Sequence, residues 1–164
     1  MMDEQAPEQE PDEAGGAAEV TRAVTRAVCR MMINYRLAPF CEFSLPNGRR
    51  ADVIGLSEKG ELTIVEVKSG PADFRSDSKW PEYFDYCDRF FFAFSTEFPK
   101  ELIPEEDRCG VILSDGWEAA IVREAPENRL SAARRKAVTI RLARASILRP
   151  TASEIVENSD EGSG

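Results

Sequence analysis

The sequence contains no histidine among its 164 residues. Histidine is the side chain that most often serves as a general base near neutral pH, and it is a frequent metal ligand. Its absence excludes a Ser-His-Asp triad and any metal centre built on imidazole. Catalysis by this chain would therefore have to use carboxylates, lysine or tyrosine.

Cysteines are few as well, and long apolar runs are missing. The four cysteines, Cys29, Cys41, Cys87 and Cys109, are scattered and include no C-x-x-C pair. This pattern argues against a zinc site or a disulfide framework and predicts small buried side chains in a reducing compartment. No segment approaches the ~20 apolar residues of a membrane span, and the acidic N-terminus is unlike a signal peptide. We therefore expect one cytoplasmic domain that makes no contact with a membrane.

Charge is unevenly distributed along the chain. The formal net charge of −9 would disfavour binding to a nucleic acid. Of the 30 acidic residues, however, seven lie within residues 1–19 and four within 151–164, where there is no lysine or arginine, so 19 acids remain with all 21 basic residues. We expect a mildly basic folded part, residues 19–150, between two disordered acidic tails, residues 1–18 and 151–164. The tails could serve only for solvation, or they could compete with DNA for the basic surface or recruit a partner.

The most informative segment is RRADVIGLSEKGELTIVEVKSG, residues 49–70. It predicts two short apolar strands around a glycine turn, with Asp52 on the first strand and Glu66 and Lys68 near the end of the second. Glu66 and Lys68 are two residues apart, so their side chains point to the same side of a strand. A buried strand seldom carries both charges unless a partner on that face uses them.

The hairpin register decides whether Asp52 joins that face. A three-residue loop that ends at a left-handed Gly60 would pair Ser57 with Glu61. The same register places Asp52 directly opposite Glu66, with Cβ atoms roughly 5 Å apart. A two-residue turn would shift the register by one residue and separate the two carboxylates.

Two carboxylates this close repel each other unless a cation lies between them. Mg²⁺ or Mn²⁺ could take one oxygen from Asp52, one from Glu66 and the carbonyl oxygen of Val67. Lys68 would then orient an attacking water or neutralise charge in a phosphoryl transition state. The alternative is a solvated edge hairpin with a surface ion pair, which the apolar residues flanking these positions argue against.

This arrangement resembles the PD-(D/E)xK nuclease superfamily. Asp52, Glu66 and Lys68 occupy the positions of the motif Asp-x(13)-Glu-Val-Lys, although Ala51 replaces the proline of the motif. The ordered segments GRRADV, IVEVKSG, WPEYFDYCDRFFFAFS and VILSDGWEA are similar to the MmcB family of bacterial DNA-repair endonucleases, over about residues 19–150. The resemblance implies a restriction-endonuclease-like fold, a Mg²⁺- or Mn²⁺-dependent deoxyribonuclease and a location at the bacterial nucleoid. Members of this superfamily can also lose activity and keep binding.

The rest of the chain predicts an α/β domain. A helix is expected at residues 19–37 and a first strand from Pro39 to Leu45, followed by a turn at residues 46–48. Further strands are expected at residues 89–95, 109–114 and 117–123. This alternation of helices and strands favours a mixed central sheet flanked by helices, in agreement with the fold that the resemblance implies.

Glu42, on the first predicted strand, is a candidate additional metal ligand. A two-residue turn at Asn47-Gly48 would place Phe43 opposite Asp52 and send Glu42 to the other face. A three-residue loop would keep Glu42 on the side of Asp52. The sequence does not decide between these two turns.

The segment after the Glu-x-Lys strand supplies further candidates. In the superfamily the helix that follows this strand borders the site, so Lys79 is a candidate phosphate contact. Trp80 and Tyr83 could contact a base or a sugar, or they could pack in the core. Asp73 and Asp77 could lie at the mouth of the site.

The last predicted helix, about residues 128–148, is strongly basic, with no acid between Glu127 and Glu154. Its cations are Arg129, Arg134, Arg135, Lys136, Arg141, Arg144 and Arg149. Its apolar residues are expected to form one stripe, made of Leu130, Ala133, Ala137, Ile140, Ala143 and Ile147. One apolar face combined with many cations predicts contacts with the DNA backbone, above all by residues 134–136 and Arg141. The alternative is a basic face that contacts only solvent.

These observations give one main hypothesis about function and two alternatives. The main hypothesis is a DNA-repair protein that hydrolyses DNA phosphodiester bonds with a divalent metal ion. The chain could instead be a non-catalytic DNA-binding adaptor that recruits other repair proteins, or a nuclease that acts on RNA, because no feature reads a 2′-hydroxyl group. The sequence leaves open the preferred DNA structure, endonucleolytic or exonucleolytic action, the number of metal ions and the oligomeric state.

Overall fold

The computed structural model describes residues 13–105 and 107–149. Its elements are, in chain order, α1 (Glu13–Asn34), β1 (Leu37–Ser44), β2 (Arg50–Ser57), β3 (Leu62–Lys68), α2 (Pro71–Ser76), the 3₁₀ helix η1 (Trp80–Tyr86), β4 (Arg89–Ser95), the 3₁₀ helix η2 (Lys100–Leu102), β5 (Gly110–Ser114), β6 (Ala119–Arg123) and α3 (Ala132–Leu148). Because α1 begins at Glu13, helix extends into the predicted N-terminal tail. The rest of that tail and the whole predicted C-terminal tail lie outside the described residues. Within the described part of the chain, no helix combines the length and the apolar character that crossing a membrane requires.

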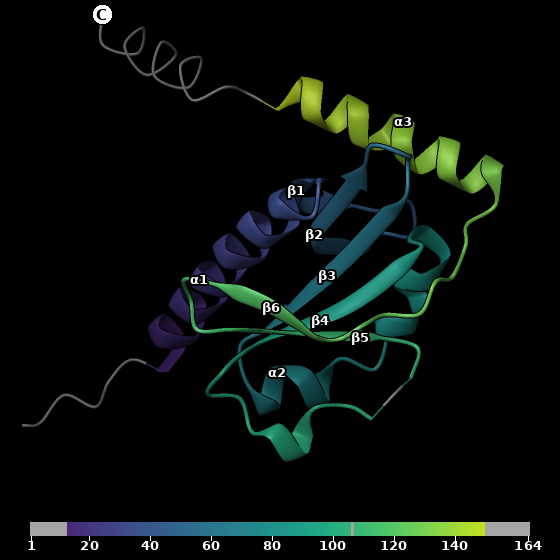
Figure 1. Ribbon diagram of the computed structural model, residues 1–164. Helices are drawn as coiled ribbons and strands as arrows, with labels where there is room; N and C mark the ends of the chain where they lie inside the picture. Colours follow the sequence, from purple (N-terminus) through teal and green to yellow (C-terminus); the bar gives the residue numbers. More distant parts are fainter. Residues whose placement is uncertain (1–12, 106, 150–164) are drawn as a thin grey trace, which may run out of the picture.

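Six strands form one mixed sheet in the order β1-β2-β3-β4-β5-β6 (Figure 1). The pairs β1–β2, β2–β3 and β5–β6 are antiparallel, whereas β3–β4 and β4–β5 are parallel. Because β3, β4 and β5 run in the same direction, their carboxyl ends lie at the same edge of the sheet. The architecture confirms the predicted α/β fold with a mixed central sheet flanked by helices.

Helices cover both faces of the sheet, and Figure 1 shows α1 and α2 on opposite sides of it. On the α1 face, Val28 of the helix belongs to one apolar cluster with Val65 and Phe91 of the sheet. On the other face, Phe90 and Phe92 belong to a second cluster, against which α2, η1 and α3 pack. Successive residues of β4 thus alternate between two cores, which is why the aromatic run in this strand is continuous, as the sequence predicted.

Both hairpin loops between the first three strands contain three residues. In the β2–β3 hairpin the N–H of Ser57 donates to the carbonyl of Glu61 at 2.9 Å, and Gly60 has a φ of 83°. This is the predicted loop, with glycine in the left-handed region where other residues are strained. In the β1–β2 hairpin the N–H of Leu45 donates to the carbonyl of Arg49 at 2.7 Å, so the alternative that the sequence left open is decided in favour of the three-residue loop.

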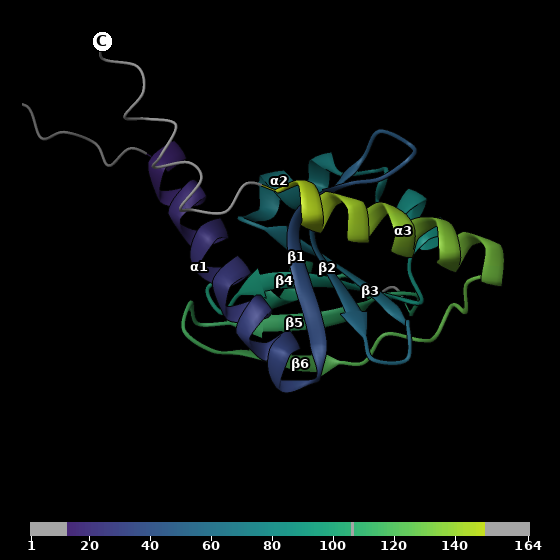
Figure 2. The ribbon, with the colours of Figure 1, turned by 90° about the horizontal axis from the view of Figure 1, so that it is seen from above.

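α3 crosses the part of the sheet that contains β1 and β2 (Figure 2). Val138 and Leu142 are its buried residues, whereas Ile140 and Ile147 of the predicted stripe are 50% and 82% exposed. The prediction of a single apolar stripe is therefore wrong, because the helix turns a different face toward the sheet. That face also contains Arg135, and the side chain of this residue anchors the helix.

The anchor is an ion pair between Arg135 and Asp88. Both terminal nitrogens of Arg135 donate to the Asp88 carboxylate at 2.6 Å, and one of them also donates to the carbonyl of Gly60 at 2.7 Å. The same carboxylate accepts the N–H groups of Leu62 at 2.8 Å and Leu130 at 3.0 Å. Asp88 therefore ties the start of β3, the start of β4 and the approach to α3 together at one point.

Candidate active site

Asp52 and Glu66 face each other just beyond the regular ladder between β2 and β3. Backbone pairing of the two strands ends at Val53 and Val65. Past this point the carboxylates bridge the strands, because Glu66 Oε1 accepts the N–H of Asp52 at 3.1 Å and Asp52 Oδ2 accepts the N–H of Val67 at 2.8 Å. The structure therefore brings the two predicted carboxylates together on opposing strands.

Both carboxylates are shielded from water. Glu66 is 6% exposed, and Asp52 is half-buried. Burial and, after it, the neighbouring charge of Asp52 raise the pKa of Glu66 to about 8. Burial also raises the pKa of Asp52 above its ordinary value. A cation bound between the two groups would favour their ionised forms.

Lys68 lies on the same side of β3 as Glu66. Its side chain is 7% exposed, and Nζ donates to Asp77 Oδ2 at 2.7 Å. Nζ also lies 6.0 Å from the centre of the Phe92 ring, on the face of the sheet that α2 and η1 cover. Burial dominates the pKa of both site carboxylates, and the charge of Lys68 acts against it. The predicted amine is thus within electrostatic reach of both acids.

Asp77 fixes this amine from the segment between α2 and η1. Its Oδ1 accepts the N–H of Lys79 at 3.1 Å, while Oδ2 accepts from Lys68. Burial acts to raise the pKa of Asp77, but the hydrogen bond and the charge of Lys68 outweigh it and lower the pKa. Asp73, the other acid expected near the mouth, instead accepts the N–H of Ser69 at 2.9 Å. The sequence could not choose between the two acids, because the turn after α2 has no spacing pattern.

Tyr83 and Trp80 pack in the core beside the site. The Tyr83 hydroxyl donates to the carbonyl of Arg50 at 3.1 Å, and its ring stacks on Phe90 with centroids 5.6 Å apart. Burial and then the nearby charge of Glu66 raise the pKa of Tyr83. Trp80 stacks on the same Phe90 ring at 5.7 Å. Of the two alternatives from the sequence, core packing is the one that the structure shows.

Glu42 does not join the carboxylate pair. The three-residue loop keeps it at the register position opposite Asp52, but its backbone is left-handed, with a φ of 59°. Its side chain is 55% exposed and pairs with Arg50 at 2.8 Å. The charge of Glu42 contributes to the raised pKa of Asp52, although less than burial does.

The donor atoms at this site suit a hard divalent cation. Within the described residues, no group of three or more acidic or thiol side chains could hold a metal ion by itself. The site instead offers two carboxylates, and the carbonyl of Val67 would be a third oxygen donor. Mg²⁺ commonly binds to one or two protein carboxylates and fills its shell with water and substrate phosphate. Asp52, Glu66 and Val67 therefore fit such an ion.

Four of the five predicted DNA-binding cations are exposed. Lys79 lies two residues after Asp77, at the N-terminal end of η1. Lys136 and Arg141 are exposed on α3, and Nε of Arg141 donates to the carbonyl of Ser44 at 2.6 Å. These positions leave the cationic groups of Lys79 and Lys136 at the surface.

Arg134, which is also exposed, and Arg135, which is half-buried, make contacts within the protein. The guanidinium of Arg134 lies 5.0 Å from the centre of the Tyr86 ring. That of Arg135 is held by Asp88 and Gly60, which gives it a structural role. Sequence spacing could not separate these neighbours, because the direction of each side chain depends on how the helix docks.

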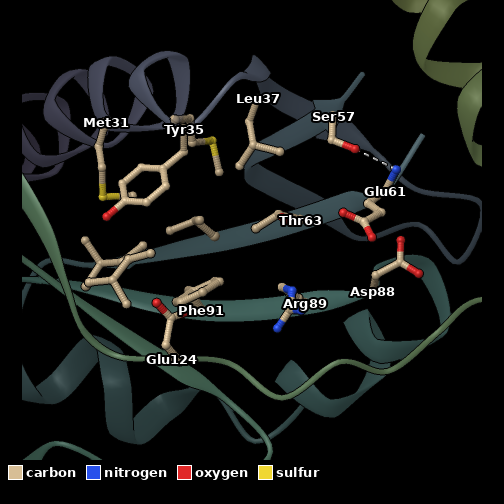
Figure 3. Close-up of a pocket in the computed structure, with 14 residues that line it drawn as sticks. Met31, Tyr35, Leu37, Ser57, Glu61, Thr63, Asp88, Arg89, Phe91 and Glu124 are labelled. Carbon is tan, nitrogen blue, oxygen red and sulfur yellow. Dashed lines mark hydrogen bonds between the residues drawn. The ribbon is translucent and has the colours of Figure 1, made fainter. Parts of the chain in front are cut away.

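A cavity of about 240 Å³ lies on the opposite face of the sheet, next to the C-terminal part of α1 (Figure 3). Met31 of α1 and Tyr35, which follows the helix, border it on one side, and Thr63 and Phe91 of the sheet form its floor. The three site residues on β2 and β3 do not line this cavity. The candidate site lies instead where the regular ladder between β2 and β3 ends, at Val53 and Val65.

Comparisons with known proteins relate most of the chain to one family. The family described as "DNA repair protein MmcB-like" matches residues 8–156. No curated protein matched the sequence. Among solved structures, a protein of unknown function from Silicibacter pomeroyi is 36% identical, with a TM-score of 0.75, over 88% of this chain and 95% of that one.

Two more distant structures share less with the chain. A repair endonuclease from Pyrococcus abyssi is 17% identical, with a TM-score of 0.33, over 59% of this chain and 43% of its own. A structure described as an EndoMS–dsDNA complex is 18% identical, with a TM-score of 0.33, over 61% of this chain and 42% of its own. Similarity at this level carries no argument about activity.

Proposed function

The chain belongs to the MmcB-like family of DNA repair proteins, and from this membership and the geometry of the site we propose that it is a divalent-metal-dependent nuclease that hydrolyses DNA phosphodiester bonds. The observation that carries the proposal is the cluster of Asp52, Glu66 and Lys68 on one face of the β2–β3 hairpin. A purely structural hairpin gains nothing from two like charges that are buried side by side, because their repulsion and desolvation oppose folding.

Asp52 and Glu66 would hold Mg²⁺ or Mn²⁺, with the carbonyl of Val67 as a further ligand. When bound, such an ion lowers the pKa of a water molecule and stabilises negative charge on a phosphate. The protein contributes the orientation of the ligands: each carboxylate accepts a backbone N–H from the opposing strand. These hydrogen bonds fix both side chains before an ion arrives.

Lys68 would orient the attacking water or stabilise charge that develops on the phosphate. Its side chain is 7% exposed, and an ammonium group shielded in this way acts more strongly on a nearby charge than one in bulk water. Asp77 is the positioning residue, since it holds Nζ at 2.7 Å.

The DNA backbone would cross the surface between η1 and α3. Lys79 is exposed beside the site, and Lys136 and Arg141 are exposed on α3. We assign backbone contacts to these three residues and keep Arg134 as a further candidate. Arg135 is left out of the DNA-binding set, because its guanidinium is occupied by Asp88.

The test is cleavage of a panel of single-stranded, nicked, flapped and duplex DNAs by the full-length protein, with matching RNAs in parallel. The wild type with Mg²⁺ or Mn²⁺ is expected to cleave at least one DNA, and EDTA should abolish the cleavage. Asp52→Asn and Lys68→Met should each lower the rate by about 100-fold or more. Lys59→Met makes the same charge change at an exposed lysine in the β2–β3 loop and should cleave like the wild type.

Circular dichroism of each variant would show that the loss is not caused by unfolding. Cleavage that survives both site substitutions would contradict the assignment and indicate a contaminating nuclease. If the folded wild type binds DNA tightly but cleaves none of the panel, the chain is an adaptor that recruits other repair proteins. Cleavage restricted to RNA would change the substrate class.

A further inference from the structure

Cys29 of α1 and Cys41 of β1 lie with their sulfur atoms 3.4 Å apart. Both residues are half-buried, so small oxidants can reach them. Cys87 and Cys109, in contrast, are 0% exposed. The prediction of buried cysteines is thus confirmed for Cys87 and Cys109. It is wrong for Cys29 and Cys41, which meet where α1 packs against the edge of the sheet.

We propose that Cys29 and Cys41 form a redox-active dithiol, which peroxide converts into a disulfide between α1 and β1. A disulfide bond has a length of about 2.05 Å, so the two sulfurs need to approach each other by only about 1.4 Å. β1 is the edge strand of the sheet, with a neighbouring strand on one side only, and it can follow this small movement.

The surroundings also favour reaction at Cys41. The hydrogen bond with Cys29 lowers the pKa of the Cys41 thiol, and the charge of Arg149 acts in the same direction against the opposing effect of burial. Arg149 is held nearby, because one of its terminal nitrogens donates to the carbonyl of Cys41 at 2.9 Å. A thiol with more thiolate character is the better nucleophile toward peroxide.

Oxidation would proceed in two steps with hydrogen peroxide as the oxidant. The Cys41 thiolate attacks one peroxide oxygen, an S–O bond forms, the O–O bond breaks, and the leaving hydroxide takes up the thiol proton to give water. The Cys29 sulfur then attacks the resulting sulfenic acid, the S–S bond forms, and hydroxide leaves with the Cys29 proton as a second water. The dithiol loses two electrons and two protons, and one peroxide becomes two waters.

The bond would form beside the candidate active site. Cys41 precedes Glu42 and pairs with Val53, the residue that follows Asp52. A disulfide would therefore fix the edge strand at this position against α1 and restrain the segment that joins them. The inference depends on the sulfur positions alone and does not require the protein to be a nuclease.

The experiment treats the reduced full-length protein with one equivalent of hydrogen peroxide, alkylates the remaining thiols after denaturation and maps the peptides by mass spectrometry. We expect a peptide that links Cys29 to Cys41 and lacks two hydrogen atoms, while Cys87 and Cys109 are alkylated. Dithiothreitol should reverse the link. The oxidised protein should also melt at a higher temperature than the reduced protein, because the crosslink restricts the unfolded chain.

Cys29→Ser and Cys41→Ser are the controls, and each replaces one half-buried thiol with a side chain of similar size. Neither should give a linked peptide or an increase in melting temperature with peroxide. The proposal is overturned if the wild type keeps both thiols alkylatable, oxidises them separately to sulfinic acid, or links them only between two molecules on a non-reducing gel.

Discussion

Asp52 and Glu66 are two acids that lie side by side on facing strands of the β2–β3 hairpin, where their charges do not favour the stability of the fold. Each carboxylate is oriented by a backbone N–H of the opposite strand, so neither can turn outward to water without losing a hydrogen bond. The consequence is two acids whose pKa values are raised by burial. Ionising these acids opposes folding, and a bound cation would remove this penalty.

We expect Glu66→Gln to stabilise the metal-free protein. Glutamine keeps an oxygen that can accept the Asp52 N–H and removes one of the two charges. In EDTA at mildly alkaline pH, the melting temperature should rise by about 3 °C or more, the shift that about 1 kcal/mol produces in a domain of this size. Differential scanning fluorimetry measures this change.

The sign of the pH dependence follows from the raised pKa. In the unfolded chain Glu66 ionises near 4.5, whereas in the folded protein it ionises near 8. The wild type should therefore lose stability relative to E66Q as the pH rises through this interval. Mn²⁺ should raise the melting temperature of the wild type and have little effect on the variant. Equal melting temperatures in EDTA throughout this range would contradict the argument.

The positioning role proposed for Asp77 can be tested separately from the proposed metal binding. Asp77→Asn keeps an acceptor for the Lys79 N–H but weakens the contact that holds Lys68 Nζ at 2.7 Å. We expect the cleavage rate to fall by about 10-fold to 100-fold, with the Mn²⁺-induced rise in melting temperature retained. Asp73→Asn is the matched control, because the Asp73 carboxylate accepts the N–H of Ser69 and is not the acid that holds Lys68. This variant should cleave close to the wild-type rate. Similar rates for both variants would remove the positioning role of Asp77.

At the scale of elements, α3 is oriented by one ion pair more than by its apolar residues. Its buried apolar residues are Val138 and Leu142, while Ile140 and Ile147 remain exposed. Arg135 reaches Asp88, whose side chain is 2% exposed and accepts two backbone N–H groups as well. A buried acid with so many partners sets the rotation of the helix, because any other rotation leaves its charge unpaired.

This ion pair predicts a contribution to stability that acid removes. Burial acts to raise the pKa of Asp88, but the hydrogen bonds from Arg135 and from two backbone N–H groups outweigh it and lower the pKa below 3.8. The stabilisation is therefore complete above the ordinary pKa and is lost as the pH falls through the lower pKa of the folded state.

We expect Asp88→Asn to lower the free energy of unfolding at neutral pH by roughly 3 kcal/mol, because it leaves the partly buried Arg135 without its counter-charge. Urea unfolding at several pH values measures the effect. The difference between the two proteins should shrink as the pH falls below 3.8. Asp115→Asn, at an exposed turn, is the matched control and should lose much less. A difference that does not change with pH would show that the charge of Asp88 is not the cause.

At the scale of the whole molecule, the net charge of −9 does not describe the surface that DNA would meet. Seven of the acids lie within residues 1–19 and four within residues 151–164, whereas all 21 basic residues lie between these ends. α3 contains no acidic residue and has exposed cations along its length. The arrangement concentrates positive charge on one helix while the protein as a whole remains acidic.

The salt dependence of DNA binding tests this separation. Replacing Lys136 and Arg144 on α3 by glutamine should weaken binding to all sequences and reduce the slope of log K against log salt by about 0.9 for each phosphate that the protein no longer neutralises. Arg22→Gln with Arg26→Gln makes the same charge change at exposed positions of α1, across the sheet. This second double variant should keep the wild-type slope. Equal slopes for both double variants would exclude α3 as the DNA-binding element.

Short-range patterns in the sequence were sufficient to predict how the residues of the candidate site are arranged. The alternation in residues 62–68 placed Glu66 and Lys68 on one side of a strand, and Gly60 indicated the three-residue loop that sets Asp52 opposite Glu66. These predictions depended on periods of two residues and on one turn. The choice of Asp77 over Asp73 could not be predicted, because it depends on an irregular turn between two short helices.

The sequence by itself determined the α/β sheet, the hairpin register and the presence of two acids and an amine on one face, because strand alternation and turn geometry are local properties of the chain. Only the tertiary structure decided that Glu42 pairs with Arg50, that Arg135 points inward and that Cys29 meets Cys41. In each of these cases, the partner or the direction of the side chain is set by how elements pack, which spacing along the chain does not encode.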